Sequence, residues 1–100
     1  MRRIVIVSKT AEKKLERLFK FLLEKWSLKV KSEFIKKLDK NINIIKNSPE
    51  SFPVSENKSG LHKCVITKQT TLYYRYDNNK IIIVTLFDTR QNPNKLKKEV

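Results

Sequence analysis

The spacing of apolar side chains changes once along this chain, and that change restricts the folds it can adopt. From residue 11 to residue 45 they recur every three or four positions, as on one face of an amphipathic helix. From residue 61 to 87 they recur every second position, as in strands with one buried face. Residues 48–60 hold serine, proline and the only glycine, which is the composition of a surface loop. This order predicts an α+β protein.

Two helices are predicted before the loop. Ser8 and Thr10 offer N-cap side chains to the first, which should begin near residue 9, and Ser27 offers one to the second. The apolar stripe of the first helix is Ala11, Leu15, Leu18, Phe19, Leu22 and Trp26, and that of the second is Val30, Phe34, Leu38, Ile42 and Ile45. The short connection predicts an antiparallel helical hairpin. We expect Trp26, at the end of its stripe, to lie in the core.

A strand is predicted at residues 2–7, and three more are predicted at 61–68, 71–76 and 81–87. The sequence DNN at residues 77–79 favours a tight turn, because Asn and Asp tolerate the backbone of short hairpins. The last three strands are therefore predicted to pair as an antiparallel meander.

The predicted strand at residues 71–76 has one oily and one polar face, because successive side chains of a strand point to opposite sides. The oily face carries Leu72, Tyr74 and Tyr76, and the polar face carries Thr71, Tyr73 and Arg75. We expect the helical hairpin to pack on the oily face of a single sheet and to leave the other face open.

One domain spanning residues 1–100 is predicted, because 100 residues with 39% apolar side chains support one modest core. Residues 92–100 are expected to form a flexible basic tail, since Pro93 and the run at 95–98 (KLKK) offer few apolar contacts.

The rare residues exclude several classes of site. A single glycine cannot provide a dinucleotide fingerprint or a Walker loop. One cysteine, Cys64, and one histidine, His62, cannot complete a four-ligand zinc site, and one cysteine cannot close an internal disulfide. We therefore expect no cofactor and no metal. The sequence has neither a signal-peptide core nor an apolar run of membrane-spanning length, so a cytoplasmic protein without a membrane partner is expected.

The net charge of +13 predicts a polyanionic partner, either a nucleic acid or an acidic protein. The excess is spread over the chain, because residues 1–50 hold 14 basic and 6 acidic groups and residues 51–100 hold 9 and 4.

The open face and the end of the last strand are where we expect functional residues. Arg90 is either a clamp for an anionic group of a partner, or a structural partner of Asp88 or a solvated strand end. Arg75 has the same two interpretations. The pair His62 and Lys63 is a candidate for proton transfer and phosphate binding, although an isolated histidine is more often an ordinary strand residue.

Two further residue types have a structural and a functional interpretation. The tyrosines of the middle strand are candidates for base stacking, with Tyr73 on the open face, while those on the oily face are better explained as core. Cys64 is interpreted as a small apolar strand residue.

Four ordered segments give the chain a family resemblance. They are residues 4–8 (IVIVS), 9–15 (KTAEKKL), 72–76 (LYYRY) and 87–93 (FDTRQNP). Together with the size, the basic charge and the element order, they resemble the RelE/ParE family of bacterial type II toxins over roughly residues 2–94.

The resemblance implies a growth-inhibiting toxin that is neutralised by a cognate antitoxin, in a system of the plasmid-stabilisation type. RelE-like members cut messenger RNA on the ribosome without a metal, using basic residues of the open face and a late aromatic residue. ParE-like members poison DNA gyrase without catalysis.

When the functional residues of the family are matched to positions of this sequence, the match favours a gyrase poison. Arg90 matches the arginine that closes the last strand, but Thr71 stands where the RNA-cutting branch has an arginine, and residues 94–96 (NKL) replace its late tyrosine. His62, Lys63 and Lys68 are possible substitutes for that branch's basic set, so a ribosome-dependent endoribonuclease is the alternative.

A non-toxic basic RNA-binding domain is a third interpretation, because charge alone would produce it. For the antitoxin we expect an anionic partner that is held by apolar anchors, at an exposed edge strand and at outward apolar residues of the hairpin. These residues are Phe21, Leu23, Ile35 and Ile44.

Overall fold

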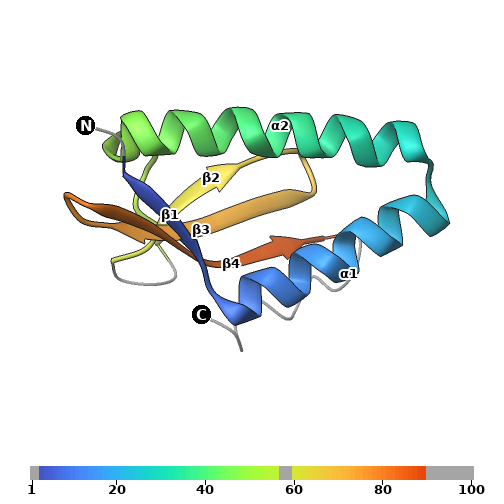
Figure 1. The fold of residues 1–100 in the computed structure, drawn as a ribbon, viewed down its shortest axis with the longest axis horizontal. Coiled ribbons are helices and arrows are strands. Elements are labelled where there is room, and N and C mark those ends of the chain that lie inside the picture. The colour runs from blue at the N-terminus through green and yellow to red at the C-terminus, as the bar shows by residue number, and fades with distance from the viewer. Residues whose placement is uncertain (1–2, 57–59, 90–100) are drawn as a thin grey trace.

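Two helices and four strands follow one another in the predicted order. The computed structural model describes residues 3–56 and 60–89. Its elements are β1 (Ile4–Val7), α1 (Lys9–Lys25), α2 (Leu28–Asn47), the short 3-10 helix η1 (Pro49–Ser51), β2 (His62–Val65), β3 (Thr70–Tyr76) and β4 (Lys80–Asp88) (Figure 1). The α+β class is confirmed, and the predicted tail at residues 92–100 lies outside the described residues.

The four strands form one mixed sheet in the order β1-β4-β3-β2. The last three strands pair as the predicted antiparallel meander. The first strand, β1, is parallel to β4, with Val5 opposite Ile81, and the helical hairpin lies in the long connection between them. A parallel pair requires such a crossover, so the two helices are also what brings β1 to this edge of the sheet.

The strand expected at residues 61–68 is wrong in length, because β2 ends at Val65. The chain reverses directly after it. The amide of Ile66 donates to the Thr70 carbonyl (2.9 Å), and the amide of Thr70 donates to the Thr67 carbonyl (3.2 Å) and to Thr67 Oγ1 (3.1 Å). The threonine side chain therefore stabilises a tight turn within the apolar-polar alternation that reads as a longer strand.

Both helices begin at the predicted serine caps. The amide of Ala11 donates to Ser8 Oγ (3.0 Å), and that of Val30 donates to Ser27 Oγ (3.1 Å). Each bond satisfies one of the amides that the first turn of a helix leaves without an internal partner. The loop after α2 contains Gly60 at φ +82°, a left-handed backbone that glycine adopts without strain.

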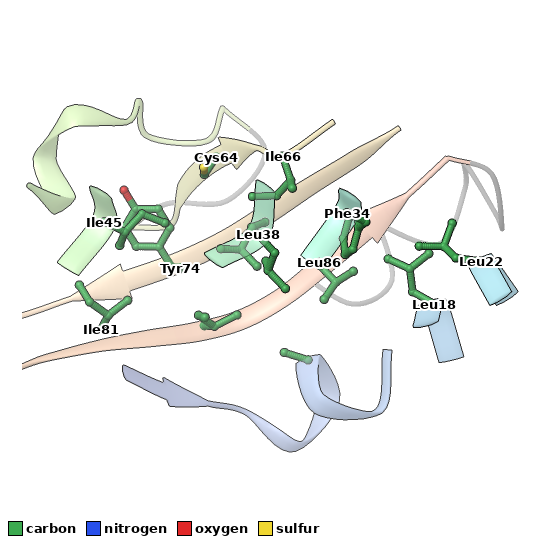
Figure 2. Close-up of a cluster of buried hydrophobic side chains, with 13 residues drawn as sticks. Leu18, Leu22, Phe34, Leu38, Ile45, Cys64, Ile66, Tyr74, Ile81 and Leu86 are labelled. Carbon is green, nitrogen blue, oxygen red and sulfur yellow. The ribbon is translucent and has the colours of Figure 1, made fainter. Parts of the chain in front are cut away.

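The core lies between the two helices and one face of the sheet (Figure 2). Leu18 and Leu22 of α1 are fully buried, and Phe34 of α2 lies edge-on to Phe19 with ring centroids 6.1 Å apart. The sheet contributes the predicted oily face. Its buried members are Cys64, Leu72, Tyr74, Ile81, Ile83 and Leu86.

Trp26 is not in the core, which corrects the expectation from its stripe. Its side chain is 58% exposed. The helix α1 ends at Lys25, and Trp26 is the C-cap, with φ −120° and ψ −94°. Because its backbone has left the helical path, the i+4 spacing from Leu22 no longer places the indole on the buried face.

We expect Leu22→Ala to lower the free energy of unfolding by about 2 to 5 kcal/mol, because Leu22 is 0% exposed and its removal leaves a cavity. The matched control is Leu28→Ala. Since Leu28 is 65% exposed, its replacement should change stability by no more than about 0.5 kcal/mol. Urea denaturation measures both, and equal losses would contradict the placement of Leu22.

Candidate functional site

The sheet has a second face, opposite the core, which we call the open face. Residues paired across neighbouring strands point to the same side, so the register identifies its members. Lys63 is opposite Tyr73, Arg75 is opposite Ile82, and Ile6 is opposite Ile82 from the other side. The open face thus consists of Ile4, Ile6, Lys63, Val65, Thr71, Tyr73, Arg75, Lys80, Ile82, Thr85 and Phe87.

Three of the predicted site residues, Lys63, Tyr73 and Arg75, share this face. Arg75 is exposed and Lys63 is half-buried, so both cations can reach a partner. Tyr73 is only 6% exposed, and burial raises the pKa of its hydroxyl group. It therefore offers little ring surface for stacking, which differs from the expectation of an accessible aromatic residue.

His62 lies on the other side of the sheet from Lys63. Its register partner is Tyr74, and the two rings stack with centroids 5.4 Å apart and an angle of 23°. The Nδ1 atom of His62 donates to the Phe52 carbonyl (2.8 Å), because a carbonyl can only accept. His62 and Lys63 therefore point to opposite faces, since adjacent strand residues alternate, and their role as a pair stays a prediction.

The neighbourhood of His62 is an aromatic cluster under the loop that follows α2. The His62 ring is 5.2 Å from that of Tyr76, and the Tyr74 hydroxyl donates to the Pro49 carbonyl (2.6 Å). The Arg3 guanidinium lies over Tyr76, 5.6 Å from the ring centroid, and its Nε donates to the Asp77 carbonyl (2.8 Å). These contacts tie the loop and the start of β1 to the sheet, so the local role of His62 is structural.

Of the other two candidates, Lys68 is not brought to this cluster or to the open face by any described contact. Lys68 is exposed in the turn between β2 and β3. Arg90, the main candidate for an anion clamp, lies outside the described residues. Its role stays a prediction.

Cys64 is confirmed as a small buried strand residue. It is 0% exposed, and its Sγ is 3.5 Å from Asn41 Oδ1. Burial raises the pKa of its thiol from 9.0 to about 11, because the thiolate is disfavoured away from water.

This shift predicts a loss of stability at alkaline pH. The unfolded chain releases the thiol proton near pH 9.0 and the folded chain near pH 11, so the contribution of Cys64 is complete below the first value and is lost as pH rises towards the second. Between about pH 8 and about pH 10, the free energy of unfolding of the native protein should fall by about 1 kcal/mol more than that of the Cys64→Ala variant. Denaturant titrations at the two pH values measure this, and parallel losses would contradict it.

The described residues give no geometric basis for a metal site, because no three His, Cys, Asp or Glu side chains among them gather closely enough to share an ion. In the same part of the chain, neither helix combines the length and the apolar character needed to cross a membrane.

The two edges of the sheet differ. The outer edge of β2 is covered by the preceding loop, since the Lys63 amide donates to the Pro53 carbonyl (2.9 Å) and Val54 bridges to His62. Within residues 3–56 and 60–89, no segment pairs with the outer edge of β1. That strand also exposes Ile4 (69%) and Ile6 (45%) on the open face.

Sequence analysis missed the apolar half of the open face. Residues 4–7 (IVIV) are apolar at every position, so both faces of β1 look buried in the sequence. Only the register with β4 separates Val5, on the core side, from Ile4 and Ile6. The uninterrupted apolar pattern was the available signal, because a strand that is covered on one side only normally alternates.

Comparison with known proteins identifies the family. A family model described as the ParE toxin of the type II toxin-antitoxin system parDE matches residues 5–93. The chain belongs to the ParE toxin family. The resemblance to the RelE/ParE toxins is thereby confirmed, whereas a search of curated proteins gave no significant match.

Solved structures share the fold of this ParE-family toxin at low identity. A chain of the chromosomal ParDE system of P. aeruginosa has a TM-score of 0.71 at 7% identity, covering 87% of this chain and 96% of its own. The YoeB dimer of Staphylococcus aureus has a TM-score of 0.62 at 17% identity, and the match covers 87% of this chain and 97% of the YoeB chain. A chain of the E. coli DinJ-YafQ toxin-antitoxin complex has a TM-score of 0.62 at 11% identity, and the match covers 94% of this chain and 100% of that chain. At these identities the likeness establishes the fold alone.

Proposed function

We propose that this ParE-family toxin acts in the cytoplasm by poisoning DNA gyrase through protein contact, without catalysis. The observation that carries the proposal is the separation of His62 from the open face. A ribonuclease needs a proton acceptor beside the cations that hold the phosphate. Here the only histidine stacks on Tyr74 at the core side, while Lys63 and Arg75 lie on the opposite side.

Tyr73 does not replace the missing base. Its hydroxyl group is on the open face, but burial raises its pKa, so the deprotonated form is disfavoured at neutral pH. What the open face offers is three cations, Lys63, Arg75 and Lys80, beside exposed isoleucines. This combination favours binding to a protein over chemistry on a phosphate.

A ribosome-dependent endoribonuclease remains the second candidate. Lys63 and Arg75 share one face, and two cations on a strand pair suit the phosphates of a bound message. In that case His62, Lys68 or Arg90 would have to complete the site.

We further propose that a cognate antitoxin adds a strand to the outer edge of β1. No backbone group of the described segments pairs with this edge, and Ile4 and Ile6 beside it provide apolar anchors. Of the anchors expected on the helices, Ile44 (40%) is exposed near the end of α2, and Phe21 and Ile35 are half-buried. Leu23 (47%) is exposed in the last turn of α1, at the opposite end of that helix from β1, so it does not belong to this proposed contact. The net charge of +13 indicates an acidic antitoxin.

The target is tested by adding the purified protein to DNA gyrase with relaxed plasmid and ATP. We expect inhibition of supercoiling and accumulation of cleaved plasmid, both relieved by the co-purified antitoxin. Codon-phased cleavage of messages after induction, with gyrase unaffected, would establish the ribonuclease instead. If the protein causes neither lesion, the third interpretation, a non-toxic RNA-binding domain, is supported.

The arginines are tested by growth arrest after induction. If each clamps an anionic group of the target, Arg75→Ala and Arg90→Ala should each weaken target binding by about ten- to a hundredfold, because a charge-assisted hydrogen bond contributes about 1.5 to 3 kcal/mol. The melting temperature should stay unchanged. Lys36→Ala, at an exposed position of α2, is the matched control. Full growth arrest by the two alanine variants at normal protein levels would contradict the clamp.

The Asp88→Ala variant cannot test whether Arg90 is a structural partner of Asp88, because Asp88 has a structural role of its own. Its carboxylate is buried and accepts a hydrogen bond from Thr70 Oγ1, which joins the start of β3 to the end of β4. Asp88→Ala should therefore destabilise the fold whatever Arg90 does.

A further inference from the structure

The connection between the two helices carries an exposed apolar group, which we call the hairpin tip. It consists of Leu23 (47% exposed), Trp26 (58%) and Leu28 (65%). Leu23 belongs to the last turn of α1, Trp26 is its C-cap, and Leu28 is the first residue of α2. The three residues therefore lie within six positions of one another along the chain, around the connection between α1 and α2, which is at one end of the molecule (Figure 1).

The surroundings of the tip are basic. Residues 17–31 contain one acidic side chain, Glu24, and five basic ones, which are Arg17, Lys20, Lys25, Lys29 and Lys31. Lys31 lies over the Phe19 ring (5.9 Å to the centroid), and the other four are exposed. An apolar centre with a cationic rim fits an acidic protein surface that contains an apolar pocket.

The tip is far from the edge proposed for the antitoxin. The helix α1 begins two residues after β1 and contains 17 residues, so it spans about 25 Å between β1 and the tip. At the other end of α2, Arg3 donates to the Lys46 carbonyl, which places the start of β1 a whole helix away from Leu28. A segment bound along β1 therefore leaves the tip uncovered.

We propose that the hairpin tip is the surface that docks on the toxin's target protein, with Trp26 entering an apolar pocket rimmed by acidic side chains. The inference rests on the proposed function, because it requires that the target is a protein. Tryptophan is strongly enriched among residues that dominate binding energy, and flanking leucines exclude water around it.

Two other classes of partner fit the tip less well. Helices that bind membranes lie flat with a long apolar face, but here those faces are buried in the core, and the tip exposes three apolar side chains around a turn. A nucleic acid could stack on the indole, yet it would leave both leucines without an apolar contact.

Trp26 is the only tryptophan, so 5-fluorotryptophan gives a single ¹⁹F resonance that reports on the tip. We expect purified DNA gyrase to shift or broaden this resonance, and the antitoxin alone to leave it unchanged. Vesicles of phosphatidylglycerol and a single-stranded RNA are the comparison probes. A response to either of them, with none to gyrase, would overturn the proposal.

Variants test the tip in two ways, through gyrase binding and through growth arrest, and the second does not assume the target. Trp26→Ala and Leu28→Ala should each weaken gyrase binding by about tenfold or more and reduce growth arrest, with melting temperature and antitoxin binding retained. Trp26→Phe should retain more gyrase binding and growth arrest than Trp26→Ala, because it keeps an aromatic ring at this position. The matched control is Val54→Ala, because Val54 is 53% exposed in the loop before β2.

The possible outcomes separate the two proposals. If gyrase binds the native protein but the tip variants bind it and arrest growth equally well, the docking surface is wrong and the proposed function stands. If gyrase does not bind, yet the tip variants lose growth arrest while remaining folded, the proposed target is wrong and the tip still contacts the target.

Discussion

The pairing of β3 with β4 is the constraint on which the rest of this structure depends. These are the two longest strands, and β4 also carries β1 on its other edge. The pairing contains an irregularity, because Tyr73 is opposite Thr85 while Tyr74 is opposite Ile83, and Val84 has no counterpart. Such a bulge keeps Ile83 and Leu86 of β4, which are three positions apart, on the core face on both sides of the extra residue.

The same alternation separates structural from functional side chains. Along β2, His62 and Cys64 face the core and Lys63 faces away, so neighbours in the sequence belong to different environments. The core side is closed by hydrogen bonds to the loop carbonyls of Pro49 and Phe52. The open face has accessible cations, and this division is why binding fits the surface better than acid-base chemistry.

The described surface has two separate regions that can accept a partner. One is the outer edge of β1 with its exposed isoleucines, and the other is the hairpin tip around Trp26. The helix α1 holds them apart as a rigid spacer. A toxin with this geometry can be bound at the sheet while its helical end still contacts another protein, so neutralisation and target recognition need not compete for one site.

The sequence by itself determined the local structure. Ser8 and Ser27 start the helices at the predicted positions because a cap acts within three residues, and the meander follows from alternation and a short polar turn. The family was also accessible, since its segments are read in order along the chain. The core face of β3 was predictable for the same reason, as Leu72 and Tyr74 stand two positions apart.

Only the tertiary structure decided which strand pairs with β1, which face His62 occupies and whether Trp26 is buried. The parallel partner of β1 lies more than seventy residues away, and no local pattern encodes that register. The face of His62 depends on where β2 is anchored against Tyr74, and the exposure of Trp26 depends on the residue at which α1 ends. These features arise from contacts between distant segments, and the periodicity of a single segment does not contain them.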